Sequence, residues 1–487
     1  MIVTARQMQA CEDAALARGI TAADLMEEAG RGIAGVIRQF FPAAGTLVLY
    51  LGKGNNAGDA LVAARELVKD GWQVFGRLSG PVEEMKELPR RHFGDWVRVM
   101  DDARNEEFPR SPLVLLDGLL GIGFSGEMKP ELVALAREIK ELREARHARV
   151  VAMDLPSGLG SKHAVEADIT ACVAQIKDLL VEDGADRNVG RIALVPVKEL
   201  SRCEGDAAAA VMTPRLIRSW LPHRANDAHK GDSGRVCVLA GSRGFLGAAE
   251  LACRGAVRAG AGLTTLLVKD EVYELLASRV PPEVMVARIG DYREVLDMKA
   301  DALCIGPGLG FEDEKEVLEV MRRCRAPAVV DADALTMLSR RPDELDKMNG
   351  LPRLLTPHPG EMQRLLAHFP GWHGMDRRTL AEMFVKDAPG RTLLLKGART
   401  VVSTAGEVTL FNSTGHSGMA SGGMGDVLAG VCAALAGQRL PLHRAAGLGA
   451  WLCGRAAELA GREGLCAGDV PAHLGAALRD LKAPAVF

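Results

Sequence analysis

The chain has 487 residues, of which 48% are hydrophobic and 25% charged, so a disordered chain is excluded and ample core material is present. The 60 Lys and Arg nearly balance the 63 Asp and Glu, for a net charge of -3. We therefore expect no nucleic-acid partner, because such a partner selects for an excess of basic residues. At ~150 residues per domain the length corresponds to about three domains, and two large α/β domains fit nearly as well.

The ten cysteines are scattered along the chain without a CxxC pair, which argues against a zinc cluster or a thioredoxin-type site. We expect buried free thiols, as in the reducing cytosol. Glu12 and Asp13 lie where a secretory signal would need an apolar run. The longest uncharged stretch, residues 408–425, is interrupted by glycines and cannot form a membrane-spanning helix. The sequence therefore predicts a cytoplasmic protein without a membrane partner, and we expect a homo-oligomer.

Short apolar runs alternate with helical patterns through the first 200 residues. Continuously apolar runs suit strands that are buried on both faces of a mostly parallel sheet, and they occur at residues 47–51, 113–117, 150–154 and 191–195. Between the second and third runs, residues 132–148 carry apolar side chains at the spacing of an amphipathic crossover helix. This alternation predicts an α/β domain.

An Ala-rich segment after Cys203 breaks the pattern, and the alternation restarts beyond residue 213. We place a domain boundary near residue 210, which gives domains 1–210 and 211–487. The apolar runs expected as strands of the second domain are residues 235–239, 263–268, 302–305, 328–331, 354–356 and 392–396. The fold class expected is two tandem three-layer α/β domains.

Three of the expected strands of the first domain run into unusual polar turns, at residues 52–59, 117–126 and 154–158. Carboxyl ends of parallel strands share one edge of a sheet, so these turns line one cleft if their strands are neighbours. Asn56, Asp117 and Ser157 offer hard oxygen donors, which suit a cation without redox chemistry. A simpler alternative is that Asp59 or Asp154 only caps a helix or a turn.

These turns, together with residues 4–8 and 25–31, resemble the NAD(P)H-hydrate epimerase domain. The resemblance implies a Rossmann-like domain with proton transfer by Asp154 and potassium at Asn56, Asp117 and Ser157. It implies that the hydrate is bound by Asn55, Asn56, Ala57, Gly58, Asp59, Gly121, Ile122, Gly123, Phe124, Ser125, Gly126, Glu127 and Asp154. Ala57 and Ala60 replace glycines that are usual in this family. If position 57 needs a positive φ, alanine costs about 1 kcal/mol there and weakens the epimerase.

The second domain contains four glycine-rich loops, at residues 229–235, 305–310, 354–361 and 418–426. Gly422, Gly423 and Gly425 precede an apolar helix and would leave backbone N–H groups free to cradle phosphate, unless the loop is simply a tight turn capped by Asp426. We expect Asp426 to be ionised, because the helix dipole favours a carboxylate, and to act as a base in phosphoryl transfer. Its low pKa would make it a weak base, so the positioning of Asp426 beside the substrate hydroxyl must supply much of the rate enhancement.

The second half resembles the ribokinase-like superfamily and, within it, the ADP- or ATP-dependent NAD(P)H-hydrate dehydratases. The matching segments are residues 229–234, 306–310, 331–335, 356–361 and 396–400. The resemblance implies that the hydrate contacts Ala248, Gly308, Gly310, His358 and Asp426, with His358 and Asp426 catalytic. It implies nucleotide binding by Lys396, Gly397, Ala398, Arg399, Thr400 and Gly425, and Glu361 is a candidate ligand for magnesium. Taken alone, a single His such as His358 is more often a packing or surface residue.

Both resemblances together imply one bifunctional protein that repairs NADH hydrate and NADPH hydrate, with K⁺, Mg²⁺ and ADP or ATP as co-substrate. The alternative is a ribokinase-like kinase for a small molecule such as a vitamin precursor, fused to a non-catalytic nucleotide-binding domain. That protein would release a stable phosphorylated product. In a third possibility, the first domain only binds its ligand.

Overall fold

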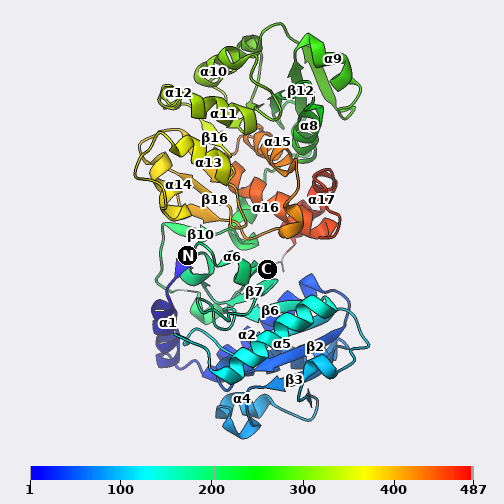
Figure 1. The fold of residues 1–487 in the computed structure, drawn as a ribbon, viewed down its shortest axis with the longest axis vertical. Helices are drawn as coiled ribbons and strands as arrows, with labels where there is room; N and C mark the ends of the chain where they lie inside the picture. The colour runs from blue at the N-terminus through cyan, green and yellow to red at the C-terminus, as the bar shows by residue number, and fades with distance from the viewer. Residues whose placement is uncertain (1, 202, 484–487) are drawn as a thin grey trace. The chain divides into compact units, whose positions relative to one another are not determined.

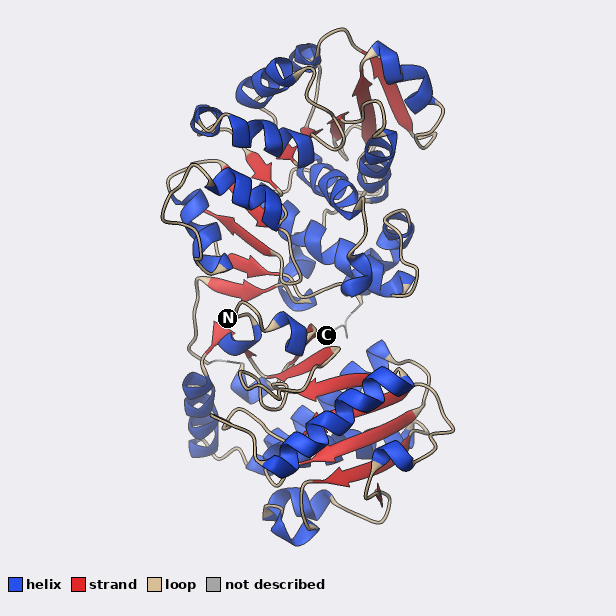
Figure 2. Ribbon diagram, viewed as in Figure 1, coloured by secondary structure: helices blue, strands red, loops and turns tan. Residues whose placement is uncertain are grey.

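A computed structural model describes residues 2–201 and 203–483. The chain forms two compact units, one ending at Ala207 and the other beginning at Ala208 (Figure 1). Both are α/β units built on a central sheet (Figure 2), so the expected fold class is confirmed.

The first unit contains a seven-stranded parallel sheet in the order β4-β3-β2-β5-β6-β7-β9. Its strands are β2 (Thr46–Leu51), β3 (Gln73–Leu78), β4 (Arg98–Val99), β5 (Leu113–Gly118), β6 (Arg149–Met153), β7 (Ile169–Val173) and β9 (Arg191–Val195). All four strands expected in this half are present. The strands before the three polar turns, β2, β5 and β6, lie side by side, as one shared cleft requires.

Helices cover both faces of this sheet. Along β2, Leu47, Leu49 and Leu51 pack with α2 and α3, whereas Val48 and Tyr50 pack with α5 on the other face. This alternation explains why β2 is continuously apolar. The helices of the unit are α1 (Ala5–Ala17), α2 (Ala22–Phe40), α3 (Asn55–Lys69), α4 (Glu87–His92), α5 (Pro130–Arg146) and α6 (Asp186–Val189). The predicted crossover helix is α5.

The N-terminal segment is attached to this unit by a strand pairing and by a disulfide. β1 (Ile2–Val3) pairs with β8 (Ile176–Lys177), and Cys11 on α1 is bonded to Cys203. The expectation that all cysteines are free thiols is therefore wrong for this pair, because the β1–β8 pairing and the packing of α1 bring two distant cysteines together. The other eight cysteines are free, and all of them except Cys466 are buried.

The second unit contains a ten-stranded sheet in the order β10-β19-β18-β17-β16-β15-β14-β11-β12-β13. Its strands are β10 (Ala209–Val211), β11 (Arg235–Leu239), β12 (Leu263–Val268), β13 (Val284–Arg288), β14 (Ala302–Ile305), β15 (Ala328–Val330), β16 (Arg353–Leu355), β17 (Arg391–Leu395), β18 (Val401–Thr404) and β19 (Thr409–Phe411). The six expected strands are present, and neighbouring strands are parallel except at the β17–β18 and β18–β19 pairs.

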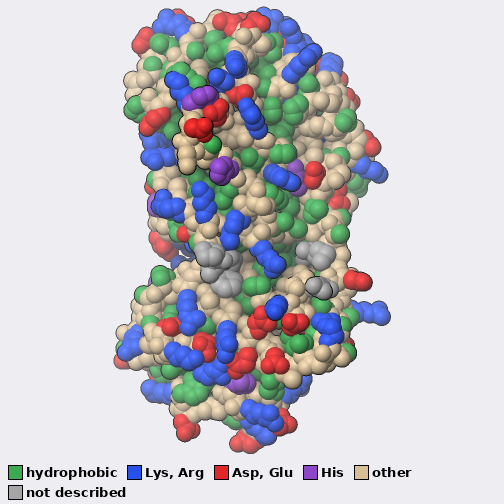
Figure 3. Space-filling model, turned by 180° about the vertical axis from the view of Figure 1, so that it is seen from behind, with side chains coloured by type: hydrophobic (Ala, Val, Ile, Leu, Met, Phe, Trp, Pro, Cys, Tyr) green, Lys and Arg blue, Asp and Glu red, His purple; other side chains and the backbone are tan. Residues whose placement is uncertain are grey.

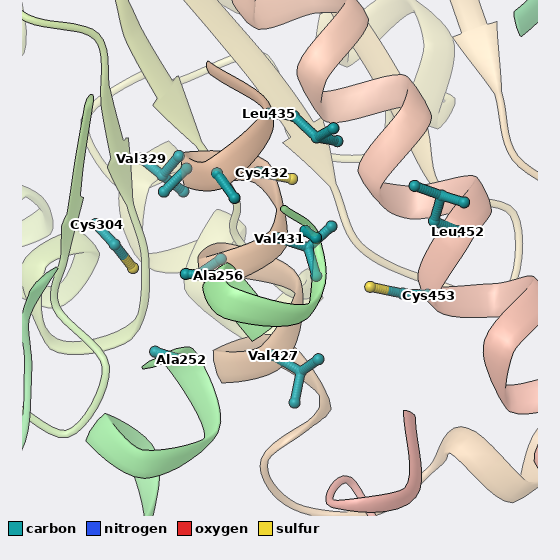
Figure 4. Packing of buried hydrophobic residues seen from close by; sticks show 14 of the residues in the cluster. Ala252, Ala256, Cys304, Val329, Val427, Val431, Cys432, Leu435, Leu452 and Cys453 are labelled. Carbon is teal, nitrogen blue, oxygen red and sulfur yellow. The ribbon is translucent and has the colours of Figure 1, made fainter. Parts of the chain in front are cut away.

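The helix that follows the glycine-rich loop, α15 (Met424–Gly437), runs through the core of the second unit, and ten of its fourteen residues are buried. Figure 4 shows Val427, Val431 and Leu435 within this core. A Cβ on Gly430 would lie 1.9 Å from the backbone oxygen of Ala252, so glycine is what permits α8 to pack this closely. The other helices are α7 (Pro214–Ile217), α8 (Leu246–Arg258), α9 (Asp270–Ala277), α10 (Glu314–Arg323), α11 (Ala332–Arg340), α12 (Asp343–Lys347), α13 (Pro359–Leu366), α14 (Arg377–Lys386), α16 (Leu442–Ala460) and α17 (Asp469–Lys482).

Surface charges of both signs are interspersed on the face shown in Figure 3. Within the described residues, no helix combines the length and apolar character needed to cross a membrane.

Candidate active sites

The first unit contains a cavity of about 680 Å³ at the carboxyl ends of its central strands. Residues from all three polar turns line it, and α1 adds Met8, Gln9 and Glu12. Of the residues predicted to bind the hydrate, those in the lining are Asn55, Asn56, Asp59, Gly121, Ile122, Gly123, Phe124, Ser125, Glu127 and Asp154. The prediction that three neighbouring strand ends form one cleft is therefore confirmed.

Ala57, Gly58 and Gly126 are not part of that lining. The turn after β2 is shorter than expected, because α3 begins at Asn55 rather than at Ala60. Ala57 therefore has a helical backbone and is buried, and the strain suspected at this position does not exist. Gly58 faces Met26, whose sulfur would lie 2.4 Å from an added Cβ.

Asp154 occupies a left-handed backbone conformation, with φ of 63°, directly after β6. Its carboxylate accepts a hydrogen bond of 3.1 Å from the Val173 N–H and forms an ion pair with Lys177. Burial alone would favour a neutral amine, but the Asp154 carboxylate outweighs it and raises the pKa of Lys177. A non-glycine residue at positive φ beside a buried ion pair is the kind of strained geometry that clusters at functional sites.

Glu12 and Asp59 are two of the further carboxyl groups that line the cavity. Burial and the charge of Asp154 raise the pKa of Glu12, and the same two causes raise that of Asp59 well above its ordinary value. Glu12 and Lys177 are site residues that no sequence motif predicts. Lys177 lies on a two-residue strand with no motif around it. For α1, the only indication in the sequence is the i, i+4 spacing of Met8 and Glu12, which places both side chains on the same face of a helix.

The three residues predicted to hold a cation lie together at the base of the strand ends. Asp117 accepts hydrogen bonds from the Ser157 N–H at 2.8 Å and from the Ser157 hydroxyl at 2.5 Å. Asn56 donates its amide to the Leu120 carbonyl at 2.7 Å, and the Leu120 N–H bonds Ser157 Oγ at 2.9 Å. Burial raises the pKa of Asp117 to about 6, and no cationic side chain among the described residues pairs with it. The Asp117 carboxylate, the Ser157 hydroxyl and the Leu120 carbonyl therefore place hard oxygen atoms close together, which is the donor chemistry that a cation without redox chemistry takes.

The second site lies where the glycine-rich loop enters α15. Gly423 precedes the helix with φ of 90°, a conformation that favours glycine, and no side chain caps the helix start. An added Cβ on Gly425 would lie 3.1 Å from Lys396 Nζ and 3.4 Å from Asp331 Oδ2. The loop therefore brings open backbone N–H groups beside a lysine, which is an arrangement suited to phosphate.

Asp426 differs from its expected state. Burial, followed by the charge of Asp331, raises its pKa to about 7, although Lys396 acts in the opposite direction. The expectation of an ionised, low-pKa carboxylate is wrong, because the loss of hydration and a nearby like charge outweigh the helix dipole. A carboxyl group that titrates near neutrality is a better base than the sequence suggested.

Lys396 is shared among acidic groups at this site. Its amine lies 2.8 Å from Asp331 Oδ1 and 3.8 Å from Glu361 Oε2. Glu361 is buried, which is the main reason that its pKa is raised, and it accepts a 2.8 Å bond from the His358 N–H. His358 caps α13, and its Nδ1 accepts the N–H groups of Gly360 and Glu361 at 3.0 and 3.3 Å. His358 is therefore both a helix cap and a half-exposed ring beside the site.

The remaining predicted residues of the second unit fall into two groups. Gly308 approaches Ala248 so closely that an added Cβ would lie 2.9 Å from the Ala248 Cβ, and the Gly310 N–H bonds Asp333 Oδ2 at 2.9 Å. After β17, Gly397 and Ala398 are exposed, whereas Arg399 and Thr400 are buried. Arg377 fixes this turn by donating to the carbonyls of Lys396 and Arg399.

Comparisons with known proteins match both halves. Residues 236–479 match the family model described as NAD(P)H-hydrate dehydratase, and residues 22–179 match that of the YjeF-related protein N-terminus. A protein of Moorella thermoacetica called bifunctional NAD(P)H-hydrate repair enzyme is 34% identical to this chain, and the match covers 94% of this chain and 92% of that protein. A protein of Coxiella burnetii with the same name is 33% identical, and the match covers 96% of this chain and 97% of that protein. A crystal structure of ADP/ATP-dependent NAD(P)H-hydrate dehydratase from Bacillus subtilis, co-crystallised with ATP and Mg²⁺, is 28% identical, covers 56% of this chain and 99% of its own, and has a TM-score of 0.48. The chain belongs to the family of bifunctional NAD(P)H-hydrate repair enzymes.

Proposed function

We propose that this protein repairs hydrated NADH and NADPH. The first unit interconverts the R and S epimers of the hydrate, and the second dehydrates the S form with ADP or ATP, releasing AMP and phosphate when ADP is used. The observation that carries this proposal is Asp426, a carboxyl group with a pKa of about 7 beside Lys396 at an uncapped, glycine-rich helix start. The proposal includes a cytoplasmic location and homo-oligomeric assembly.

The second site can turn a poor leaving group into a good one. The hydrate carries a hydroxyl on C6, next to the ring nitrogen, and hydroxide departs poorly near neutral pH. Asp426 accepts the hydroxyl proton while the oxygen attacks the terminal phosphorus of the nucleotide, and the helix start and Lys396 stabilise the charge on the transferred group. The lone pair of the ring nitrogen then expels phosphate, and loss of a C5 proton restores the dihydronicotinamide.

The acidic residues around Lys396 suit magnesium. Asp331 and Glu361 offer buried carboxylate oxygens, and the Glu361 carboxylate is already oriented by the His358 N–H. We assign Glu361 as the candidate ligand, through water, and the ion would neutralise charge on the phosphoryl group. Gly425 and residues 396–400 would hold the nucleotide, and Ala248, Gly308, Gly310 and His358 the hydrate.

The first site supplies the epimer on which the dehydratase acts. Asp154 is our candidate for proton transfer, with its carboxylate fixed by Lys177 and by the Val173 N–H. Potassium at Asn56, Asp117 and Ser157 would compensate the buried Asp117 carboxylate and fix the neighbouring turns.

The test is to incubate the protein with NADH hydrate and each nucleotide while recording dihydronicotinamide absorbance and inorganic phosphate. Repair predicts that both appear together in equal amounts. A stable phosphorylated product without recovered NADH would instead identify a small-molecule kinase.

A further inference from the structure

α1 contributes an acidic side chain to the cavity of the first unit. Met8 and Glu12 are one helical turn apart, so they share a face of α1, and both line the cavity. Asp13 is exposed and accepts a hydrogen bond from Gln9 instead. The helix therefore directs one carboxyl group towards the cavity and leaves the next in solvent.

The position of Glu12 is fixed by three independent contacts of the N-terminal segment. In the β1–β8 pairing, Val3 lies opposite Lys177, the residue that holds Asp154. Cys11 is bonded to Cys203, and Met8 and Ala15 pack with Val197 and Leu200. A side chain on a helix anchored in this way is pre-organised, as a reacting group needs to be.

Epimerisation at C6 requires two proton transfers. The C6 carbon of the hydrate is a hemiaminal, and it inverts when its bond to the ring nitrogen breaks and re-forms on the other face. A base must take the hydroxyl proton as the C6–N bond breaks, giving an aldehyde, while an acid must protonate the nitrogen, which keeps the bonding electron pair. After rotation about C5–C6, both transfers reverse, so the net change is inversion alone.

We propose that Glu12 is the second catalytic group of this reaction, the acid that protonates the ring nitrogen while Asp154 takes the hydroxyl proton. This inference rests on the epimerase function proposed above. Asp154 is paired with Lys177, whereas Glu12 has no ion-pair partner within 4 Å among the described residues. The groups that face Glu12 are Asp154 and Lys177, with Asp13 beside it on α1 and Asp59 opposite on α3. Burial and the negative charges of Asp154 and Asp13 favour the protonated form of Glu12 that an acid needs, and Lys177 only partly opposes them.

The test uses the full-length protein with one purified epimer, and follows the other by chromatography across a pH series. Glu12→Gln should lower kcat for epimerisation about 100-fold or more with little change in KM, and should abolish the loss of kcat at high pH that marks an essential acid. Glu12→Asp should restore part of the rate and that limb of the profile. Asp13→Asn is the matched control on the same helix: it should keep the wild-type rate at neutral pH and, because the Asp13 charge helps to raise the pKa of Glu12, should move the high-pH limb only slightly to lower pH.

Three outcomes separate the possibilities. An unchanged rate in Glu12→Gln overturns the role of Glu12 and leaves the epimerase function intact. If the pH profile of Asp59→Asn lacks the high-pH limb while that of Glu12→Gln retains it, the acid is Asp59 and the role proposed for Glu12 is overturned. Absence of epimerisation in the wild type, with dehydration of the S form intact, overturns the proposed function of the first unit itself.

Discussion

Lys396 forms an ion pair with the buried Asp331, with 2.8 Å between Nζ and Oδ1, at the edge of the turn that opens α15. The same lysine is 3.8 Å from Glu361 Oε2, so one positive charge serves several carboxyl groups. Asp426 therefore keeps too little compensation to remain a strong acid, and burial raises its pKa to about 7. Burial and the Asp331 charge, which Lys396 only partly offsets, explain why a carboxyl group at a helix start can act as a base near neutral pH.

Asp426→Asn should remove the proposed base without removing the phosphate-binding backbone. We expect turnover of the S hydrate to fall ~100-fold or more, as for loss of a general base, while nucleotide affinity stays within a few-fold. Calorimetric nucleotide binding and single-epimer assays measure the two effects. Asp387→Asn, on an exposed residue, is the control. Unchanged turnover in Asp426→Asn contradicts the assigned role.

The dehydratase should show an acid limb in its pH profile. Asp426 is active when deprotonated, so kcat/KM should rise with pH through about 7 and then level off. The unfolded carboxyl group titrates near pH 4, so ionisation of the folded one costs stability progressively between about pH 4 and 7. Asp426→Asn should therefore be more stable than wild type at pH 8, by about 1–2 kcal/mol after allowance for solvent screening, and indistinguishable from it near pH 4. Urea unfolding at both pH values tests this sign.

Epimerisation, but not dehydration, should depend on potassium. Exchange of K⁺ for tetramethylammonium should slow interconversion of the epimers, because the buried Asp117 carboxylate loses its counter-charge. Asp117→Asn should remove the response to K⁺ and leave S-hydrate dehydration unchanged. A K⁺ response that survives in Asp117→Asn places the ion elsewhere.

The Lys177–Asp154 ion pair should contribute both to the stability of the first unit and to the rate of epimerisation. Lys177→Met leaves the partly buried Asp154 carboxylate uncompensated, which we expect to cost the first unit about 3 kcal/mol and to lower epimerisation ~100-fold. Lys162→Met, on an exposed lysine, should do neither. Urea unfolding of the first unit and the single-epimer assay give the two readouts, and full activity in Lys177→Met would show that the pair is dispensable.

The disulfide predicts a thiol count. The denatured, unreduced protein should react with a thiol reagent at eight cysteines, and the reduced protein at ten, because only Cys11 and Cys203 are paired. Cys203→Ser should raise the count without reduction to nine, by freeing Cys11. Ten reactive thiols in unreduced wild type would contradict the pairing.

The sequence was sufficient to predict the strands that position both sites, because each is a continuous apolar run that ends in glycine or a polar residue. It did not indicate β8, which carries Lys177, because two residues show no periodicity. The sequence did not predict the ionisation state of Asp426 either. The helix dipole, which lowers the pKa, can be inferred from the local sequence, whereas burial and the charge of Asp331, which raise it, depend on residues about a hundred positions away. The cost considered at Ala57 depended on where α3 begins, and the apolar pattern does not define this helix start, at which Gly54 provides no side-chain cap.

The most direct test is to give racemic NADH hydrate and the preferred nucleotide to wild type and to Asp154→Asn, within a time in which the epimers do not interconvert unaided. Wild type should convert the whole mixture to NADH and release an equal amount of phosphate. Asp154→Asn should show the same initial rate of dehydration but should stop when about half of the hydrate has been converted. If wild type also stops at half, or consumes nucleotide without restoring NADH, the two units do not perform the paired repair described here.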